Sequence, residues 1–455
     1  MKSLQHSPDR EARSPWSRHN DKQRVTLSPP HARVEGVIRL AGSKSMTNRA
    51  LIMAALAKGT STIEGILQSD DSYWCIDCLT RLGVKVILEG ATVLVEGCGG
   101  SWPIASGELY VGAAGTVARF LPGALAAGEG SWTLTGSRRM AERPMAPLLT
   151  ALSHLGVRLA YERKELCLPF VLQSSGLQGG TVSLPGSTSS QFISGVLLSA
   201  PYAKAPLSVH IEGDVVQRDY VQMTLDMMGM FGVTPTVAEG GQRITVPTGG
   251  YQAGTIRLEP DVSACCYFWA LAALTGGRIR IEGINRTSTC QPDIELLDVL
   301  DPMGSTVIRG EDFVEVAGTG QLKGGFQLSM QRMSDQTLTI AAMAPFADGP
   351  ITLTDAAHIR HHECDRIAAV CKELRKLNIQ VEEHADGLTV YPGRPEPAVL
   401  DSHDDHRMAM ALSLIGTKVQ GVQIADPGCV SKTCPDYFER LSALGIGVAY
   451  TEEPG

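Results

Sequence analysis

Apolar and polar residues recur in a fixed order along most of the chain. A cluster of small or polar residues precedes an apolar run of about 12 residues with helical spacing, which is followed by a segment of alternating apolar positions. The pattern predicts a helix and then a strand, and it occurs six times. The six clusters begin at Gly42, Gly112, Gly186, Glu259, Arg332 and Ser402, at intervals of 70, 74, 73, 73 and 70 residues. Such a fixed period indicates a repeat architecture.

A second motif alternates with the first and marks the end of another helix. It reads Leu-Gly-Val or a variant of it, at 82–84, 155–157, 231–233, 303–304, 377–379 and 444–446. Glycine or asparagine at its centre is typical of a left-handed helix C-cap. Each repeat therefore contains two helices and several strands, and is too small to bury its own apolar face. Six repeats exceed one core, which favours an α/β protein with two lobes of three repeats over a single long α/β domain.

Residues 1–32 lack this pattern. They are polar, charged and rich in proline, which predicts a flexible tail. The folded part is expected to begin near Arg33.

The overall composition limits the function classes. Of the 455 residues, 43% are hydrophobic and 19% charged, which is typical of a globular protein. A net charge of −8 argues against nucleic acid or a membrane surface as a partner. No apolar run approaches the ~18 residues of a spanning helix, so we expect a soluble cytoplasmic protein. The eleven cysteines are scattered and odd in number, which predicts reduced thiols, and the CxxC of Cys75 and Cys78 lacks the second pair of a zinc site.

The polar clusters at the predicted helix starts are candidates for anion binding. Ser43, Ser189 and Ser334 are good N-caps, but one polar residue suffices for a cap and several clusters add more, with a lysine or arginine. Helix N-termini expose N–H groups and carry about half a positive charge. Several of them around one cleft would bind an anionic ligand without a basic overall composition.

Seven stretches of the chain resemble the EPSP synthase family (3-phosphoshikimate 1-carboxyvinyltransferases), from about Val34 to Ala449. They are GSKSMTNRALIMAALAKG at 42–59, AGT with Arg119 at 114–119, RRMAERPM at 138–145, SSQFISGVLLSAP at 189–201, RHHECDRI at 360–367, DDHRMAMALSL at 404–414 and DPGCVSKTCPDYFERL at 426–441. The resemblance implies the enolpyruvyl transferase fold, in which two inside-out α/β barrels of three βαβαββ units close over the substrates. The first lobe would span 42–257, and the second 258–455 together with 33–41.

The resemblance also implies the reaction. The enolpyruvyl group of phosphoenolpyruvate would pass to the 5-hydroxyl of shikimate 3-phosphate with release of phosphate, in the shikimate pathway, by a monomer that needs no cofactor or metal. The arginine fork suits the phosphate and carboxylate of phosphoenolpyruvate. The residues implied for phosphoenolpyruvate are Lys44, Gly115, Arg139, Gln191, Arg366, Arg407 and Lys432.

Proton transfer needs carboxylates or a lysine at the reacting atoms. The resemblance implies Asp335 as the base near the acceptor hydroxyl, and Glu363 with Lys44 as the acid at the enol end; the alternatives are a helix cap for Asp335 and a surface salt bridge for Glu363. His406 with Arg407 would hold the departing phosphate. The implied acceptor-binding residues are Ser45, Arg49, Ser189, Ser190, Gln191, Tyr220, Asp335, His358 and His362.

Four positions depart from the family pattern. Ala113 replaces an asparagine, Gln217 a serine, His358 an asparagine and His362 a lysine. Loss of the lysine ammonium weakens phosphate binding near pH 7, although Arg218 or a charged His362 could compensate. The chain is thus either an EPSP synthase with a retuned acceptor site or a paralogue that acts on a differently substituted shikimate-like cyclitol.

Three other functions compete with this one. A metallohydrolase could use His361, His362 and Glu363 with His403 and His406, but adjacent histidines on a helix cannot face one ion. A non-catalytic relative would only bind shikimate-like ligands. A UDP-N-acetylglucosamine enolpyruvyl transferase would need a cysteine in a loop of the first half, and residues 102–148 contain none.

Overall fold

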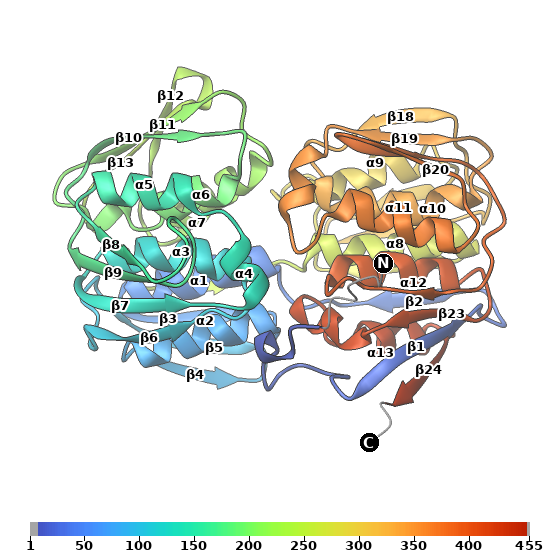
Figure 1. Ribbon diagram of the computed structural model, residues 1–455, viewed down its shortest axis with the longest axis horizontal. Helices are drawn as coiled ribbons and strands as arrows, with labels where there is room; N and C mark the ends of the chain where they lie inside the picture. Colours follow the sequence, from blue (N-terminus) through green and yellow to red (C-terminus); the bar gives the residue numbers. More distant parts are fainter. Residues whose placement is uncertain (1–7, 453–455) are drawn as a thin grey trace. The chain divides into compact units, whose positions relative to one another are not determined.

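The computed structural model describes residues 8–452, which form two compact units. The N-terminal unit comprises residues 41–259 together with 11–15, and the C-terminal unit comprises 16–40 and 260–452 together with 8–10. Both units consist of helices and four-stranded sheets (Figure 1). Within the described residues, no helix is both long and apolar enough to cross a membrane.

The N-terminal unit contains three sheets, with the strand orders β14-β3-β5-β4, β6-β7-β9-β8 and β10-β11-β13-β12. Its strands are β3 (Lys58–Glu64), β4 (Lys85–Glu89), β5 (Thr92–Cys98), β6 (Ser106–Tyr110), β7 (Glu129–Thr135), β8 (Arg158–Tyr161), β9 (Phe170–Ser175), β10 (Gly180–Pro185), β11 (Leu207–Glu212), β12 (Thr236–Ala238), β13 (Arg243–Val246) and β14 (Thr255–Arg257). Its α-helices are α1 (Lys44–Leu56), α2 (Asp70–Arg81), α3 (Gly115–Ala126), α4 (Arg138–Glu142), α5 (Ala146–His154), α6 (Ser190–Leu197) and α7 (Asp219–Met230).

The C-terminal unit also contains three sheets, with the orders β2-β15-β17-β16, β18-β19-β21-β20 and β22-β23-β1-β24. Its strands are β1 (Lys22–Ser28), β2 (Glu35–Ile38), β15 (Arg278–Glu282), β16 (Thr306–Arg309), β17 (Phe313–Ala317), β18 (Phe326–Ser329), β19 (Ile351–Thr354), β20 (Val381–His384), β21 (Gly387–Val390), β22 (Val399–Leu400), β23 (Val422–Ala425) and β24 (Gly447–Glu452). Its α-helices are α8 (Val262–Thr275), α9 (Leu296–Leu300), α10 (Thr337–Met343), α11 (Arg366–Lys376), α12 (His406–Gly416) and α13 (Tyr437–Ala443).

All six sheets have the same pattern. The first strand pairs in parallel with the second, and the remaining two strands add in antiparallel fashion, as in β6-β7-β9-β8. With the two helices between these strands, the unit is βαβαββ, so the predicted repeats and fold class are confirmed. No described sheet closes on itself, because each is a separate set of four strands.

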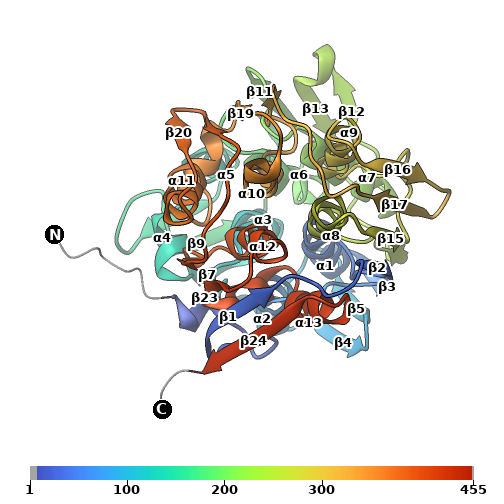
Figure 2. The ribbon, with the colours of Figure 1, turned by 90° about the vertical axis from the view of Figure 1, so that its right-hand side faces the viewer.

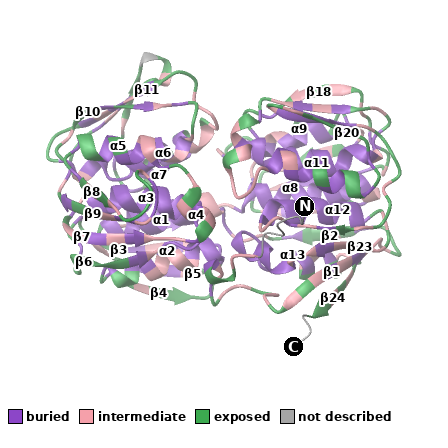
Figure 3. Ribbon diagram, viewed as in Figure 1, coloured by how far each residue is buried: buried purple, intermediate pink, exposed green. Residues whose placement is uncertain are grey.

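The helices that begin at the polar clusters form the core of each unit. Figure 2 shows α8, α10 and α12 side by side at the centre of the C-terminal unit, and Figure 3 shows how fully such helices are buried. In α3 and α12 every residue is buried, and in α8 all but the last. A helix that is apolar on all sides suits such a position, because it contacts other elements on all sides.

The second motif ends helices as predicted. Its central residue has a positive φ in all six repeats, which for asparagine is uncommon and for glycine costs no steric strain. The angles are 85° at Gly83, 98° at Gly156, 84° at Gly232, 104° at Gly304, 62° at Asn378 and 89° at Gly445.

The predicted flexible tail is wrong for much of residues 1–32. Residues 1–7 lie outside the described part, but Lys22–Ser28 form β1, which lies between β23 and β24 and pairs antiparallel with both. The inward side chains Val25 and Leu27 are fully buried, and this burial fixes the strand in the core. Two apolar positions at alternate residues are too weak a signal to predict a strand from sequence.

Candidate active site

The N-termini of α11 and α12 and the turn before α10 carry a buried network of charges in the C-terminal unit. Arg366, at the start of α11, is its centre and is only 1% exposed. It donates to Asp405 through Nε (2.7 Å to Oδ2) and Nη2 (3.2 Å to Oδ1), a forked pairing. Nη1 donates to Oδ1 of Asp335 (2.8 Å) and Nη2 to Oε2 of Glu363 (3.1 Å). Burial by itself lowers the pKa of Arg366, but the charges of Asp405, Glu363 and Asp335 outweigh it and raise the pKa overall.

Two further cations complete the network. Arg407 lies 2.8 Å from Oδ2 of Asp335 through Nη2, and Lys432 lies 2.8 Å from Oε1 of Glu363 through Nζ. Three carboxylates thus face three cations, all at most 13% exposed. The network brings together five of the predicted site residues: Asp335, Glu363, Arg366, Arg407 and Lys432.

The alternatives weighed for the two carboxylates do not fit this geometry. The N-cap residue of α10 is Gln336, whose side chain makes no capping bond, while Asp335 pairs with two arginines. Glu363 is mostly buried and pairs with Arg366 and Lys432, so it is no surface salt bridge. His406 is 1% exposed, with Nδ1 3.8 Å from Oδ1 of Asp405.

The two histidines that depart from the family pattern lie beside this network. Nδ1 of His362 is 3.1 Å from Nη1 of Arg366 and 4.0 Å from Oδ1 of Asp335. Nε2 of His358 is 2.8 Å from Oγ of Ser334, and the two imidazole rings meet edge to face at 5.8 Å. Burial lowers the pKa of His358.

A buried carboxyl that the sequence did not single out lies behind the network. Asp293 is 2% exposed and accepts hydrogen bonds at Oδ2 from Oγ of Ser263, in the first turn of α8, and from Nε2 of Gln336 (2.7 Å). Burial raises its pKa to about 6, and the charge of Asp335 adds to the shift. Asp293 therefore links the start of α8 to the turn that carries Asp335.

In the N-terminal unit the predicted site residues also lie at helix N-termini, but neutral oxygens dominate. Arg49, on α1, is 1% exposed and donates to Oγ1 of Thr224 (2.8 Å), to the carbonyls of Ser45 (2.9 Å) and Tyr220 (3.1 Å), and to Oγ of Ser194 (3.4 Å). Its guanidinium also lies 4.7 Å from the centre of the Phe120 ring. Arg49 thereby holds the starts of α1 and α7 against α6.

The remaining predicted residues of this unit lie on or next to α1, α3, α4 and α6. Lys44, at the first position of α1, has Nζ 3.7 Å from Oδ2 of Asp71. Ser189 caps α6, accepting from the backbone N–H of Gln191 (3.2 Å), and Ser190 is buried behind it. Arg139 lies apart on α4, 40% exposed and paired with Glu142.

The structure adds one cation that the sequence analysis did not assign. Gly115, the first residue of α3, lies between two guanidiniums, because a Cβ placed there would meet Nη1 of Arg143 at 2.8 Å and Nη1 of Arg119 at 3.3 Å. Arg143 lies in the RRMAERPM stretch that carried part of the resemblance, but charge alone did not distinguish it from Arg138 or Arg139.

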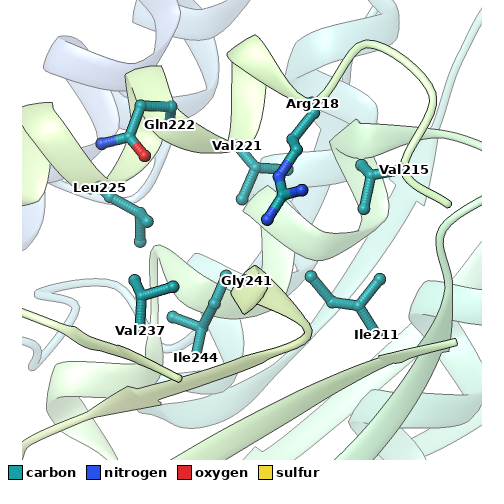
Figure 4. Close-up of a pocket in the computed structure, with 9 residues that line it drawn as sticks. All are labelled: Ile211, Val215, Arg218, Val221, Gln222, Leu225, Val237, Gly241 and Ile244. Atoms are coloured by element: carbon teal, nitrogen blue, oxygen red, sulfur yellow. The ribbon is translucent and has the colours of Figure 1, made fainter. Parts of the chain in front are cut away.

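A small pocket near the start of α7 is lined by none of the predicted site residues. Its volume is about 40 Å³, and its lining, drawn in Figure 4, is Ile211, Val215, Arg218, Val221, Gln222, Leu225, Val237, Gly241 and Ile244. Arg218 donates through Nη2 to the carbonyl of Gly240 (2.7 Å). Apart from Arg218 the walls are uncharged and mainly apolar, so the pocket offers a phosphate a single cation.

The histidines considered for a metal site are placed differently. His403 pairs through Nε2 with Oε1 of Glu373 (2.8 Å), and His361 is exposed. Between residues 8 and 452 no three His, Cys, Asp or Glu side chains group as a metal site would require. The eleven cysteines form no disulfide in the described part of the chain, and burial raises the pKa of Cys75 and Cys78.

Comparisons with known proteins agree with this geometry. The family model described as EPSP synthase (3-phosphoshikimate 1-carboxyvinyltransferase) matches residues 29–441. The 3-phosphoshikimate 1-carboxyvinyltransferase 2 of Halalkalibacterium halodurans is 53% identical over 445 residues, covering 97% of this chain and 99% of that protein. The 3-phosphoshikimate 1-carboxyvinyltransferase of Trichormus variabilis is 42% identical over 410 residues, covering 90% and 96%. A solved structure of EPSP synthase from Acinetobacter baumannii superposes with a TM-score of 0.78 at 26% identity, covering 94% and 100%. The chain therefore belongs to the EPSP synthase family.

Proposed function

We propose that the chain transfers the enolpyruvyl group of phosphoenolpyruvate to the 5-hydroxyl of shikimate 3-phosphate and releases phosphate. The observation that carries this proposal is the family match along nearly the whole chain, to a relative 53% identical over 97% of it. The buried charge network supports it, because it supplies acids, bases and anion-binding groups within a few ångströms.

The donor is bound by the cations and helix starts named from the sequence. We assign phosphoenolpyruvate to Lys44, Gly115, Arg139, Gln191, Arg366, Arg407 and Lys432, and add Arg143. The phosphate and carboxylate of the donor together carry about three negative charges near neutral pH, and arginine forks suit both groups.

The network explains how one carboxylate can act as an acid. Glu363 is held as an anion by Arg366 and Lys432. When an anionic donor takes over these two cations, the charged form of Glu363 loses support, and a protonated carboxyl is favoured. Glu363, with Lys44 beside the donor, then delivers a proton to C3 of the enol. C2 becomes open to attack by the acceptor hydroxyl.

Asp335 is the candidate base for that hydroxyl. Its two oxygens are fixed by Arg366 and Arg407, at 2.8 Å each, so its position is set before the acceptor binds. After the C–O bond forms, loss of a proton from C3 and of phosphate from C2 gives the enolpyruvyl ether. Glu363 takes back the proton lost from C3, and the hydroxyl proton held by Asp335 leaves with the phosphate, so protons and charges balance.

The acceptor is assigned to Ser45, Arg49, Ser189, Ser190, Gln191, Tyr220, Asp335, His358 and His362. An arginine N–H can only donate, so where Nη1 of Arg366 bonds to Nδ1 of His362 that nitrogen accepts, and the ring can donate only through Nε2. His362 then offers a single donor where the family motif has an ammonium.

A phosphate-release assay tests the proposal. With phosphoenolpyruvate present, we expect release with shikimate 3-phosphate and much less with shikimate itself. Release with another cyclitol but not with shikimate 3-phosphate would favour the paralogue, and no release with any acceptor would favour a binding protein. Glu363→Gln, which keeps size but loses the acid, is expected to lower kcat by about 10²–10⁴-fold.

We also propose that the protein acts as a cytoplasmic monomer, with small molecules rather than nucleic acid or membranes as partners. The net charge of −8 supports this, because nucleic acids and most membrane surfaces are negative. Sedimentation of the purified protein checks the monomer, and fractionation of cells checks the location.

A further inference from the structure

The segment before β1 contacts the neighbours of several site residues. We call residues 9–18 the N-terminal arm; it includes the short 3₁₀ helix Arg10–Ala12. Ala12 and Ser14 of the arm are only 6% and 4% exposed. Residues 11–15 group with the N-terminal unit and the flanking residues with the C-terminal unit, so its contacts are described unit by unit.

In the N-terminal unit the arm bonds to the start of α2. Oδ1 of Asp70 accepts from the backbone N–H of Ser14 (3.0 Å) and from its Oγ (2.6 Å). Asp70 is followed by Asp71, whose Oδ2 lies 3.7 Å from Nζ of Lys44. Both carboxylates are buried in the first turn of α2. The hydrogen bonds of Ser14 therefore reach the residue next to the carboxylate that pairs with Lys44.

The arm also contacts the glycine loop before α3 through a tryptophan. Nε1 of Trp74 donates to the carbonyl of Ala12 (2.7 Å). The indole ring closely contacts Gly112, where an added Cβ would lie 2.4 Å from it. Gly112 opens the loop that ends at Gly115, so the arm fixes one wall of this loop.

In the C-terminal unit the arm bonds to the turn before α12, the helix that carries Arg407, and to the 3₁₀ helix Pro427–Lys432. The backbone N–H of Asp9 donates to Oδ2 of Asp404 (3.1 Å), three residues before Arg407. The backbone N–H of Arg18 donates to Oγ of Ser431 (2.8 Å), and this hydroxyl also donates to the Arg18 carbonyl (3.3 Å). Ser431 is fully buried and directly precedes Lys432.

We propose that the N-terminal arm is a positioning element for the phosphoenolpyruvate-binding residues, acting through Ser14 and Ser431. The inference rests on the proposed assignment of Lys44, Gly115, Arg407 and Lys432 to that substrate. Each of the contacts described above leads to a residue assigned to phosphoenolpyruvate. Loss of the arm therefore weakens the binding of phosphoenolpyruvate more than that of shikimate 3-phosphate.

Point variants and a truncation test this role. Ser14→Ala and Ser431→Ala each remove hydrogen bonds at one anchor, and we expect each to raise KM for phosphoenolpyruvate roughly 5-fold. KM for shikimate 3-phosphate and kcat are expected to stay within about twofold. Ser153→Ala removes a serine hydroxyl that donates only to a helix carbonyl, at Leu149, and is the matched control with no effect.

Deletion of residues 1–18 should have the combined effect, a rise in KM for phosphoenolpyruvate of roughly 30-fold. A synthetic peptide of residues 1–20 added in excess should restore the original KM, which a merely structural role would not predict. If the truncated chain does not fold, the two serine variants decide the question. Unchanged KM for phosphoenolpyruvate in both serine variants would overturn the proposal.

A further variant separates this inference from the assignment on which it rests. Lys44→Gln should raise KM for phosphoenolpyruvate whether or not the arm has a role. If Lys44→Gln has this effect and the serine variants do not, the arm proposal alone is wrong. If Lys44→Gln leaves KM unchanged, the assignment of the site residue is wrong.

Discussion

Two arginines of the protein are equally buried but are held in different ways. Arg49, in the N-terminal unit, is 1% exposed and is bonded to hydroxyl and carbonyl oxygens, whereas Arg366, in the C-terminal unit, is 1% exposed and is bonded to three carboxylates. Neutral oxygens fix a guanidinium in place without cancelling its charge. Carboxylates fix a guanidinium and also cancel its charge. Their own negative charges must then be redistributed when an anionic ligand binds. The neutral oxygens therefore hold Arg49 in a fixed position, whereas the charges around Arg366 can be redistributed when a ligand binds.

The strongest way to break this comparison is to remove the centre of the ionic network. Arg366→Met leaves Asp405, Asp335 and Glu363 with fewer cations in a buried place, and we expect the free energy of unfolding to fall by about 3–5 kcal/mol. Urea denaturation measures this. Arg360→Met is the matched control, because Arg360 pairs with Asp365 and Glu383 nearer the surface and should cost about 1 kcal/mol or less. Equal losses in the two variants would contradict the role of burial.

The next test concerns the buried carboxyl behind the network. The pKa of Asp293 is raised to about 6, so an unfolded chain ionises this group at lower pH than the folded one does. Its contribution to stability is therefore full below about pH 4 and is lost as the pH rises through about 6. Asp293→Asn can keep both hydrogen bonds through one amide oxygen, and should be more stable than the original protein by about 2 kcal/mol at pH 7 but not at pH 4.

Thermal unfolding across this pH range checks the prediction for Asp293. Asp298→Asn is the control, because Asp298 is about half exposed and pairs with Arg286 and Arg309 at the surface. A stability gain that is the same at both pH values would show that ionisation of Asp293 is not the cause.

A smaller loss of stability is expected when Arg49, which is bonded to neutral oxygens, is replaced. Arg49→Met removes bonds to the carbonyls of Ser45 and Tyr220 and to Oγ1 of Thr224, which are all neutral groups. Thr224 keeps a hydrogen bond to Oγ of Ser194 (2.8 Å). We expect the free energy of unfolding to fall by about 1–3 kcal/mol, measured as for Arg366→Met. A loss larger than that of Arg366→Met would reverse the comparison between the two sites.

The smallest effect is expected from a substitution in the acceptor site. His362→Lys restores an ammonium beside Asp335, and we expect KM for shikimate 3-phosphate to fall roughly 5-fold while KM for phosphoenolpyruvate is unchanged. Steady-state kinetics with each substrate varied in turn measures both. His361→Lys, at the exposed neighbouring position, is the control. A higher KM for shikimate 3-phosphate would mean that the acceptor site is adapted to the imidazole.

The repeats were predictable because their signals are local. The polar cluster, apolar helix and glycine of each repeat lie within a few dozen residues, and the six C-caps could be named individually. The strand β1 could not be predicted, because it contributes only Val25 and Leu27 to the core and its partners lie about 400 residues away. Its pairing depends on tertiary contacts that no local pattern contains.

The sequence motifs identified the residues of the candidate site, but not the side chains with which these residues pair. The sequence gives no reason to connect Asp335 with Arg366, because the pairing depends on where two helices start in space. Asp293 and Arg143 were missed for the same reason, since a lone carboxylate or arginine in a sequence more often marks a solvated surface. The bonding of Arg49 to neutral oxygens likewise follows from the packing of α1, α6 and α7.

The position of β1 has a consequence for synthesis on the ribosome. Sheet β22-β23-β1-β24 needs residues 22–28 and 447–452, so it can form only after nearly all of the described chain has been made. Val25 and Leu27 have no partner strand until β23 has been made, at residues 422–425, while the three sheets of the N-terminal unit are already complete by residue 257. Pairing over such a sequence separation is slow, and an unpaired strand is prone to aggregate. A nascent chain stalled before residue 422 should therefore depend on chaperones for its first strand, although half of it is folded.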